Sequence, residues 1–376
     1  MTETNVQRIA DRAVVTKTST IEDVLVDARE GRPFIIVNEG ASESIGHLVV
    51  PAQMATPTII NLMVSHARGL VSLGIQAEDA KRLKLPLMAR SESSQRDDFT
   101  ASIEAREGVT TGISAFDRAR TIAVAVDPES EAKDLVSPGH VFPIIGRKGG
   151  VLFNPSHVEA GIDIARIAGL TPAAVLCQCL NNEGEVSSPD ELGLLAQEHN
   201  IKIVSVADLI VYRRRSENLV ERVASAPFSS QYCGDATIHV YLDTVHNGEH
   251  VALVRGTVRA GTTTLVRVHQ VDIATDLLGW SAARQGYVQK ALLAMQDYDG
   301  PAVAVFVDDP SPSSIADRIN GLRHEYMMTN VTLNYGLGAQ ILLDLGVRDM
   351  VLLTSSARKL AALEGFGLRV VRHQEI

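Results

Sequence analysis

The sequence predicts an α/β protein with an N-terminal α/β sandwich on a mixed sheet and a second, C-terminal α/β domain. Through Val211, short apolar runs alternate with segments of helical period, which is typical of helices packed on a sheet. After about residue 235 the pattern changes to strands joined by tight turns. A length of 376 residues suits two or three domains with separate cores. We therefore expect domains over 1–215 and 236–376, with a linker over 216–235.

The spacing of apolar residues and the turn residues predict the first helices and strands. Residues Ser19–Gly31 favour an amphipathic helix, because apolar side chains recur on one face and a glycine ends it. The run Pro33–Val37 predicts a buried strand, and Thr56–Ala67 predicts a helix after a Thr-Pro start. Regular structure is expected to lapse over Ser216–Cys233, where no clean period is visible.

A hairpin begins the second half. Asn247-Gly248 is a strong two-residue turn signal, and it joins apolar runs over 236–243 and 250–258. The elements expected after it are strands over 263–271, 301–307 and 351–354 and helices over Ala282–Met295 and Gly338–Leu345.

The composition indicates a protein of a reducing cytoplasm that binds neither nucleic acid nor membrane. A net charge of −10 implies no basic face for phosphates, and the single basic run, Arg213–Arg215, is interpreted as a solvated helix end. No apolar run approaches the roughly 20 residues of a membrane span, and the polar N-terminus lacks a signal-peptide core.

Three cysteines are too few for a disulfide framework or a cysteine-rich zinc site. Cys177 and Cys179 alternate along an apolar run, so both sulfurs point to one face of a strand. Small buried core residues are the favoured interpretation of this pair, and a ligand pair is the alternative. The third cysteine is Cys233.

The most specific motif runs from Pro138 to Ala160, read together with Gly108–Ile122. Two histidines, His140 and His157, flank a Gly-Gly turn, and the second opens a helix. Residues 19–212 resemble 3,4-dihydroxy-2-butanone 4-phosphate synthase, which converts ribulose 5-phosphate to dihydroxybutanone phosphate and formate in riboflavin biosynthesis. The resemblance rests on QMATPTIINLMVSHARGL, SIEAREGVTTGISAFDRARTI, PGHVFPIIGRKGGVL and SHVEAGIDIARIAGL.

The resemblance implies a lyase that uses Mg²⁺ or Mn²⁺. It places the metal ligands at Glu43 and His157, and a hard cation between them polarises the oxygens of the sugar. It also implies a homodimer whose active sites lie near the subunit contact. The implied substrate is ribulose 5-phosphate or a related small sugar or hydroxy-ketone.

Other functional positions of the family carry changed residues here. The family's catalytic glutamate is Gln178, and an amide does not serve as a general base, whereas the catalytic histidine is retained as His140. Substrate-binding positions fall on Ser42, His47, Asn154, Pro155, Ser156 and Val158. The arginine beside the metal glutamate is Ser42, and the substrate-binding aspartate is His47. Arg147 and Lys148 are candidates to supply phosphate affinity from the neighbouring loop.

Each of these residues also has a purely structural interpretation. Without the resemblance, Glu43 is interpreted as a solvated carboxylate. His157 is likewise interpreted as a surface histidine in the first turn of a helix with a Ser156–Glu159 capping box. His140 is equally compatible with a polar strand end, and Gln178 with a buried hydrogen-bonding amide. Asp117 is expected to anchor its loop.

Residues 236–376 resemble GTP cyclohydrolase II. That enzyme's zinc site needs three cysteines in a C-x₁₀-C-x-C arrangement, and none follows Cys233, so neither zinc nor cyclohydrolase activity is expected. The family's Gln-Glu-Gly-Arg-Gly loop is Asp308–Ile315 here, and its reactive arginine is Leu333. A scaffold, dimerisation or allosteric role remains for this domain.

Three functions are compatible with these residues. The first is the synthase reaction itself, with lost groups replaced by His47, Arg147 and Lys148. The second is a metal-dependent reaction on a different hydroxy-ketone. The third is a non-catalytic regulatory or binding role.

Overall fold

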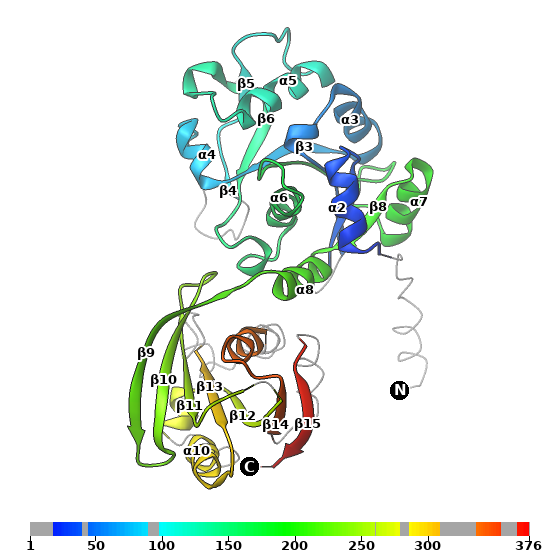
Figure 1. Ribbon diagram of the computed structural model, residues 1–376. Coiled ribbons are helices and arrows are strands. Elements are labelled where there is room, and N and C mark those ends of the chain that lie inside the picture. The colour runs from blue at the N-terminus through cyan, green and yellow to red at the C-terminus, as the bar shows by residue number, and fades with distance from the viewer. Residues whose placement is uncertain are drawn as a thin grey trace. The chain divides into compact units, whose positions relative to one another are not determined.

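The chain divides into two compact units, Met1–Tyr212 and Arg213–Ile376, in a computed structural model (Figure 1). The structure describes residues 18–39, 44–88, 98–259, 261–278, 286–308, 336–354 and 367–375. Each unit is built on its own sheet.

The N-terminal unit has an eight-stranded sheet in the order β4-β6-β3-β7-β2-β1-β8, with β5 paired to β6. Its strands are β1 (Phe34–Glu39), β2 (Ser44–Pro51), β3 (Arg68–Ile75), β4 (Asp98–Phe99), β5 (Ile103–Ala105), β6 (Leu135–Ile145), β7 (Ala174–Cys179) and β8 (Lys202–Ser205). The β1–β8 and β3–β6 pairs are parallel, and the remaining pairs are antiparallel. The predicted mixed sheet is therefore confirmed.

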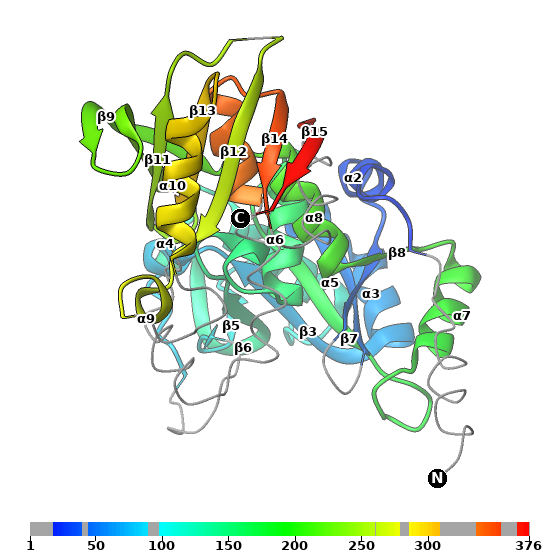
Figure 2. The same cartoon turned by 90° about the horizontal axis from the view of Figure 1, so that it is seen from below.

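Helices cover both faces of this sheet, which confirms the predicted α/β sandwich (Figures 1 and 2). The helices α2 (Ile21–Arg29), α6 (His157–Ile167) and α8 (Val206–Ser216) pack on one face. The helices α3 (Pro57–Leu62), α4 (Ala77–Arg82), α5 (Ala115–Val126) and α7 (Pro189–His199) pack on the other. Short turns are η1 (Ala52–Met54), η2 (Met63–Ala67), η3 (Ala132–Asp134) and η4 (Gly150–Leu152).

The predicted early elements are present, with one difference. Thr20 caps the start of helix α2, because its side chain accepts a hydrogen bond from the Asp23 amide, and the helix buries its apolar stripe as expected. Strand β1 is buried on both faces. The helix predicted over Thr56–Ala67 is regular only to Leu62, because a π-helical turn follows and ends at Arg68 in the left-handed region (φ 65°).

Cys177 and Cys179 are core residues of β7 on the same face of the sheet, as the alternation predicted. Both are fully buried. Burial raises the pKa of the Cys177 thiol to about 11 and that of Cys179 to about 12, so neither forms a reactive thiolate near neutral pH. Gln178 lies between them and therefore points to the opposite face.

The C-terminal unit contains a seven-stranded sheet in the order β15-β14-β12-β13-β11-β10-β9. Its strands are β9 (Val220–Ser230), β10 (Gly234–Asp243), β11 (Glu249–Arg255), β12 (Thr263–Gln270), β13 (Ala302–Val307), β14 (Asp349–Leu353) and β15 (Arg369–Gln374). Helix α10 (Tyr287–Asp297) packs on one face. A helix over 336–344 packs on the other, where Gly338 touches Val268. A short helix, α9 (Ile273–Asp276), follows β12.

The hairpin predicted through Asn247-Gly248 is present as β10–β11, but the predicted two-residue turn is wrong. Five residues, 244–248, join the two strands, and of the predicted pair Asn247 alone has a positive φ (56°). The irregular linker predicted over 216–235 is wrong, since α8 continues to Ser216 and β9 occupies Val220–Ser230. Among the described strands, β9 pairs with β10 alone, and nearly all its residues are exposed, so burial imposes no alternation on its sequence. Residues 282–285 of the predicted helix lie outside the described residues.

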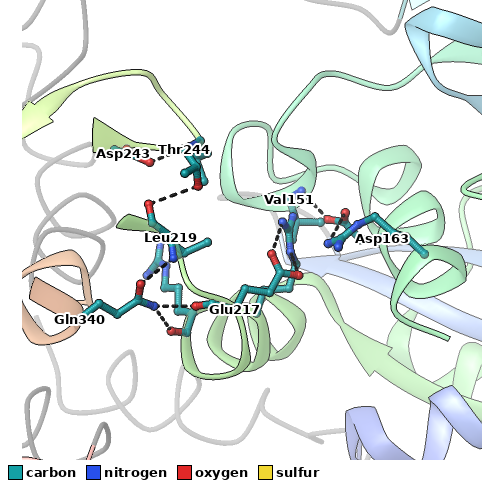
Figure 3. A network of polar contacts seen from close by, with 11 residues as sticks. Val151, Asp163, Glu217, Leu219, Asp243, Thr244 and Gln340 are labelled. Carbon is teal, nitrogen blue, oxygen red and sulfur yellow. Dashed lines mark hydrogen bonds and ion pairs between the residues drawn. The ribbon is translucent and has the colours of Figure 1, made fainter. Parts of the chain in front are cut away.

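Gln340 ties the helix over 336–344 to the beginning of this unit (Figure 3). Its amide oxygen accepts from the Leu219 backbone N–H at 2.7 Å, and its Nε2 donates to the carbonyls of Arg214 and Glu217 at 3.0 and 2.8 Å.

Among the residues described, no helix has the length and apolar character needed to span a bilayer.

Candidate active site

The start of α6 brings His157 onto the face of the N-terminal sheet. Ser156 caps the helix, because its hydroxyl accepts the Val158 N–H at 3.1 Å. The predicted capping box does not form. The Glu159 carboxylate instead accepts a hydrogen bond from the Ser156 hydroxyl and another from the Arg147 backbone N–H at 2.9 Å. Ser156 is thus engaged in capping, and His157 is fixed in the first turn.

The loop before α6 is held on both sides. The Val151 N–H donates to the buried Asp163 carboxylate of α6 at 2.8 Å (Figure 3). Asn38, near the end of β1, donates from its side-chain nitrogen to the Pro155 carbonyl at 3.0 Å. The β1–β2 hairpin therefore approaches the loop that leads into His157. Arg147 and Lys148 are exposed on the same loop.

His47 of β2 stacks on His157. The ring centroids are 3.7 Å apart, and the ring planes differ by 7°. His47 is only 7% exposed, and its Nδ1 is buried without a hydrogen-bond partner among the described residues. Burial, and next the neighbouring His157, hold the pKa of His47 well below its usual value. His47 is therefore a neutral ring near physiological pH.

Gln178 lies directly opposite His47 in the antiparallel pairing of β2 with β7. Residues opposite each other in such a pair point to the same face, with their Cβ atoms about 5 Å apart. Gln178 is half-buried. The structure thus brings Gln178, His47 and His157 together under the start of α6.

His140 lies on the same sheet face but farther along it. The register pairs Phe142 of β6 with Ser72 of β3, and Ser72 with Leu176 of β7, so Phe142 shares the face of Leu176 and Gln178. His140 precedes Phe142 by two residues and so points to that face. Strands β3 and β7 separate β6 from β2, which makes three strand spacings, about 14 Å.

The remaining predicted site residues differ in their placement. Ser42 and Glu43 lie outside the described residues, as do residues 309–315 and Leu333 of the C-terminal unit. Asn154 is half-buried and Pro155 exposed in the loop before α6. Val158 does not line the site with its side chain. It is 1% exposed and packs on Ile144 and Ile162, because its position in the helix turns it toward the sheet.

The donor set for a metal is small within the described part of the chain. No group of three or more histidine, cysteine, aspartate or glutamate side chains gathers there in a geometry that could hold an ion. Cys177 and Cys179 are directed into the core, away from His157. The ligand pair predicted at Glu43 and His157 therefore depends on a residue beyond that part.

Sequence reasoning missed Glu104 as a partner of His140. The carboxylate Oε2 of Glu104 lies 2.8 Å from His140 Nδ1. The only sequence signal was the Ile-Glu-Ala run of β5, in which a glutamate separates two apolar residues. The pairing joins residues 36 positions apart, so no local period predicts it.

Asp117 anchors its loop as expected, since its carboxylate accepts hydrogen bonds from the Thr110 and Gly112 backbone N–H groups.

Comparison with known proteins identifies two family models in the chain. The model described as 3,4-dihydroxy-2-butanone 4-phosphate synthase matches residues 22–212, and the model described as GTP cyclohydrolase II matches residues 221–375.

Relatives named as the synthase and relatives named as RibBA both match nearly the whole chain. A protein of Neisseria meningitidis serogroup B named 3,4-dihydroxy-2-butanone 4-phosphate synthase is 40% identical over 360 residues, covering 95% of this chain and 98% of the relative. The riboflavin biosynthesis protein RibBA of Aquifex aeolicus is 39% identical over 378 residues, covering 96% and 93%. The crystal structure of RibBX, a two-domain 3,4-dihydroxy-2-butanone 4-phosphate synthase from A. baumannii, superposes with a TM-score of 0.75 at 35% identity, covering 95% and 99%.

Proposed function

Because the chain belongs to the 3,4-dihydroxy-2-butanone 4-phosphate synthase family, we propose that its N-terminal unit converts ribulose 5-phosphate to dihydroxybutanone phosphate and formate. The observation that carries the proposal is the position of His157 in the first turn of α6, stacked on His47 and near Gln178. Histidine and amide side chains around one helix start suit the handling of a small polar substrate.

We propose Mg²⁺ or Mn²⁺ as the cofactor, held by Glu43 and His157. The donor chemistry fits, since a carboxylate and an imidazole suit Mn²⁺, and Mg²⁺ keeps most of its waters. The Nδ1 of buried His47, which has no hydrogen-bond partner among the described residues, also fits, because leaving such a group unpaired costs about 1–3 kcal/mol and a bound polar group relieves that cost. When bound, the ion polarises the carbonyl and hydroxyl oxygens of the substrate.

The chain's own residues carry out proton transfer and bind the phosphate and the sugar. His140 carries protons as an acid–base group. Arg147 and Lys148 bind the phosphate from their exposed loop, and Asn154 and Ser42 contact the sugar. Gln178 binds substrate through its amide and holds no proton for transfer. We also propose the homodimer that the family resemblance implies.

Formate release tests this function directly. The full chain with Mn²⁺ or Mg²⁺ is expected to release formate from ribulose 5-phosphate, as measured with formate dehydrogenase, and chelation of the metal is expected to stop it. Restoring the metal after chelation controls for damage to the protein. No formate with either metal, from protein shown to be folded by circular dichroism, would contradict the proposed reaction.

A different hydroxy-ketone substrate is the second candidate, and His47 favours it. The family resemblance implies an aspartate contact with substrate at this position, whereas His47 is a neutral, nearly buried ring. Metal binding without formate from ribulose 5-phosphate would support this candidate. Absence of both would support a regulatory role.

For the C-terminal unit we propose a scaffold or regulatory role without GTP cyclohydrolase II activity. The chain has no cysteine after Cys233, which is itself buried in the core of this unit. We expect the dialysed protein to retain no stoichiometric zinc by elemental analysis and to release no formate from GTP. One zinc per chain, or turnover of GTP, would contradict this proposal.

A further inference from the structure

The side chain of His140 is held by one carboxylate. Glu104 of β5 places Oε2 at 2.8 Å from His140 Nδ1, and the Glu104 side chain is only 12% exposed. The His140 side chain is 42% exposed, so the contact fixes one end of the ring and leaves part of it accessible. His140 is thus a functional position predicted from the sequence that has a carboxylate hydrogen-bonded to its ring.

A glycine brings the two strands close enough for this contact. A Cβ at Gly139 would lie 2.1 Å from the carbonyl carbon and oxygen of Ile103, so no other residue fits without moving β5. The Gly139 N–H also donates to the Ser102 hydroxyl at 3.2 Å. His140 and Glu104 directly follow these two contact points, where the β5–β6 register shifts between Ile103 and Glu104, so the backbone contact brings their side chains together.

A second glycine covers the other side of the carboxylate. Gly112 has φ 81°, and a Cβ there would lie 1.5 Å from Glu104 Oε1. Its loop is fixed by Asp117, whose carboxylate accepts from the Thr110 N–H at 3.2 Å, the Thr110 hydroxyl at 2.9 Å and the Gly112 N–H at 3.0 Å. The loop thus packs directly onto Glu104 and restricts where its carboxylate can go.

We propose that Glu104 is a positioning residue for His140. A carboxylate only accepts hydrogen bonds, so His140 must donate from Nδ1–H, and the neutral ring then carries its lone pair on Nε2. Nε2 is therefore the nitrogen that takes a proton from substrate. The resulting imidazolium is stabilised by the Glu104 charge, and Nε2 returns the proton in a later step. This inference rests on the proposed acid–base role of His140.

The tautomer of His140 provides the test. Glu104→Leu keeps a side chain of similar size but offers no hydrogen-bond acceptor, so the ring loses the partner that holds its proton on Nδ1 and reverts to the Nε2–H form that a free imidazole favours. Long-range ¹H–¹⁵N spectra of the full chain labelled at histidine distinguish the two tautomers at a pH where the ring is neutral. The spectrum of His140→Asn identifies the signal among the 11 histidines.

We expect an Nδ1–H tautomer in the wild type and in Glu107→Leu, a matched control at an exposed carboxylate on the same segment. We expect an Nε2–H tautomer in Glu104→Leu, with kcat for formate release lowered about 10²–10⁴-fold and KM little changed. Gly112→Ala is expected to lose the Nδ1–H preference although Glu104 is still present, because the added methyl displaces the carboxylate.

An Nε2–H ring in the wild type, or a tautomer that does not change in Glu104→Leu, overturns the inference. So does unchanged kcat in that variant. If the wild type releases no formate, the proposed reaction fails, but the spectra still decide whether Glu104 positions the ring. Because this readout does not depend on turnover, the two failures are distinguishable.

Discussion

Replacing Gln178 with glutamate, together with Ser42→Arg and Asn154→Arg, is expected to raise formate release sharply. A general acid–base group contributes about 10²–10⁴-fold in rate, so the glutamate should appear mainly in kcat. Each charged hydrogen bond from a new arginine to phosphate contributes about 1.5–3 kcal/mol, so the arginines should appear mainly in KM.

The surroundings of Gln178 suit this exchange. The side chain is half-buried, so a carboxylate of the same shape keeps access to water. It lies opposite His47, which is neutral and therefore neither repels nor neutralises the new charge. The measurement is kcat and KM with ribulose 5-phosphate for each single variant and for the triple variant. Gln197→Glu, an exposed position on α7, makes the same charge change as a control. An unchanged kcat in a folded triple variant would count against an otherwise intact site.

Removing either proposed ligand is expected to abolish tight binding of the divalent ion. Loss of a group that merely orients a ligand weakens metal affinity about 10–100-fold, so His157→Asn and Glu43→Gln should weaken Mn²⁺ binding by more than about 100-fold. Calorimetric titration of the full chain with Mn²⁺ measures this change.

Matched controls separate the ligands from general charge effects. His373→Asn and Glu198→Gln alter exposed side chains outside the proposed site, and they should bind Mn²⁺ as the wild type does. If the two ligands share one ion, the double variant Glu43→Gln/His157→Asn should lose little more than either single variant. Two ions bound by the wild type, with one lost in each single variant and both lost in the double variant, would indicate two separate sites.

The fold was predictable where burial or turn geometry constrains the local sequence. Helix α2 and strand β1 bury apolar residues in the period of their structure, and Asn247-Gly248 marks the loop between β10 and β11, although that loop is longer than the two-residue turn predicted. Strand β9 escaped prediction because it is exposed along almost its whole length, so hydrogen bonding to β10 alone defines it.

The site was predictable as a set of residues but not as an arrangement. The resemblance named His47, Gln178 and His157, yet their proximity follows from the β2–β7 register and the start of α6, which the sequence alone does not reveal. The Glu104–His140 contact depends on two backbones that touch at a glycine, a non-local condition. Val158 was assigned to the site by its place in the motif, but its helix position buries it.

We propose that His157, together with Glu43, holds the divalent ion. Pulsed electron paramagnetic resonance of the Mn²⁺-loaded protein is the most direct measurement, because it detects nitrogen nuclei bound to the metal. We predict coupling from an imidazole nitrogen in the wild type and in His373→Asn, and its loss in His157→Asn. A wild-type spectrum without nitrogen coupling, or coupling that survives in His157→Asn, would contradict the assignment of His157 as a metal ligand.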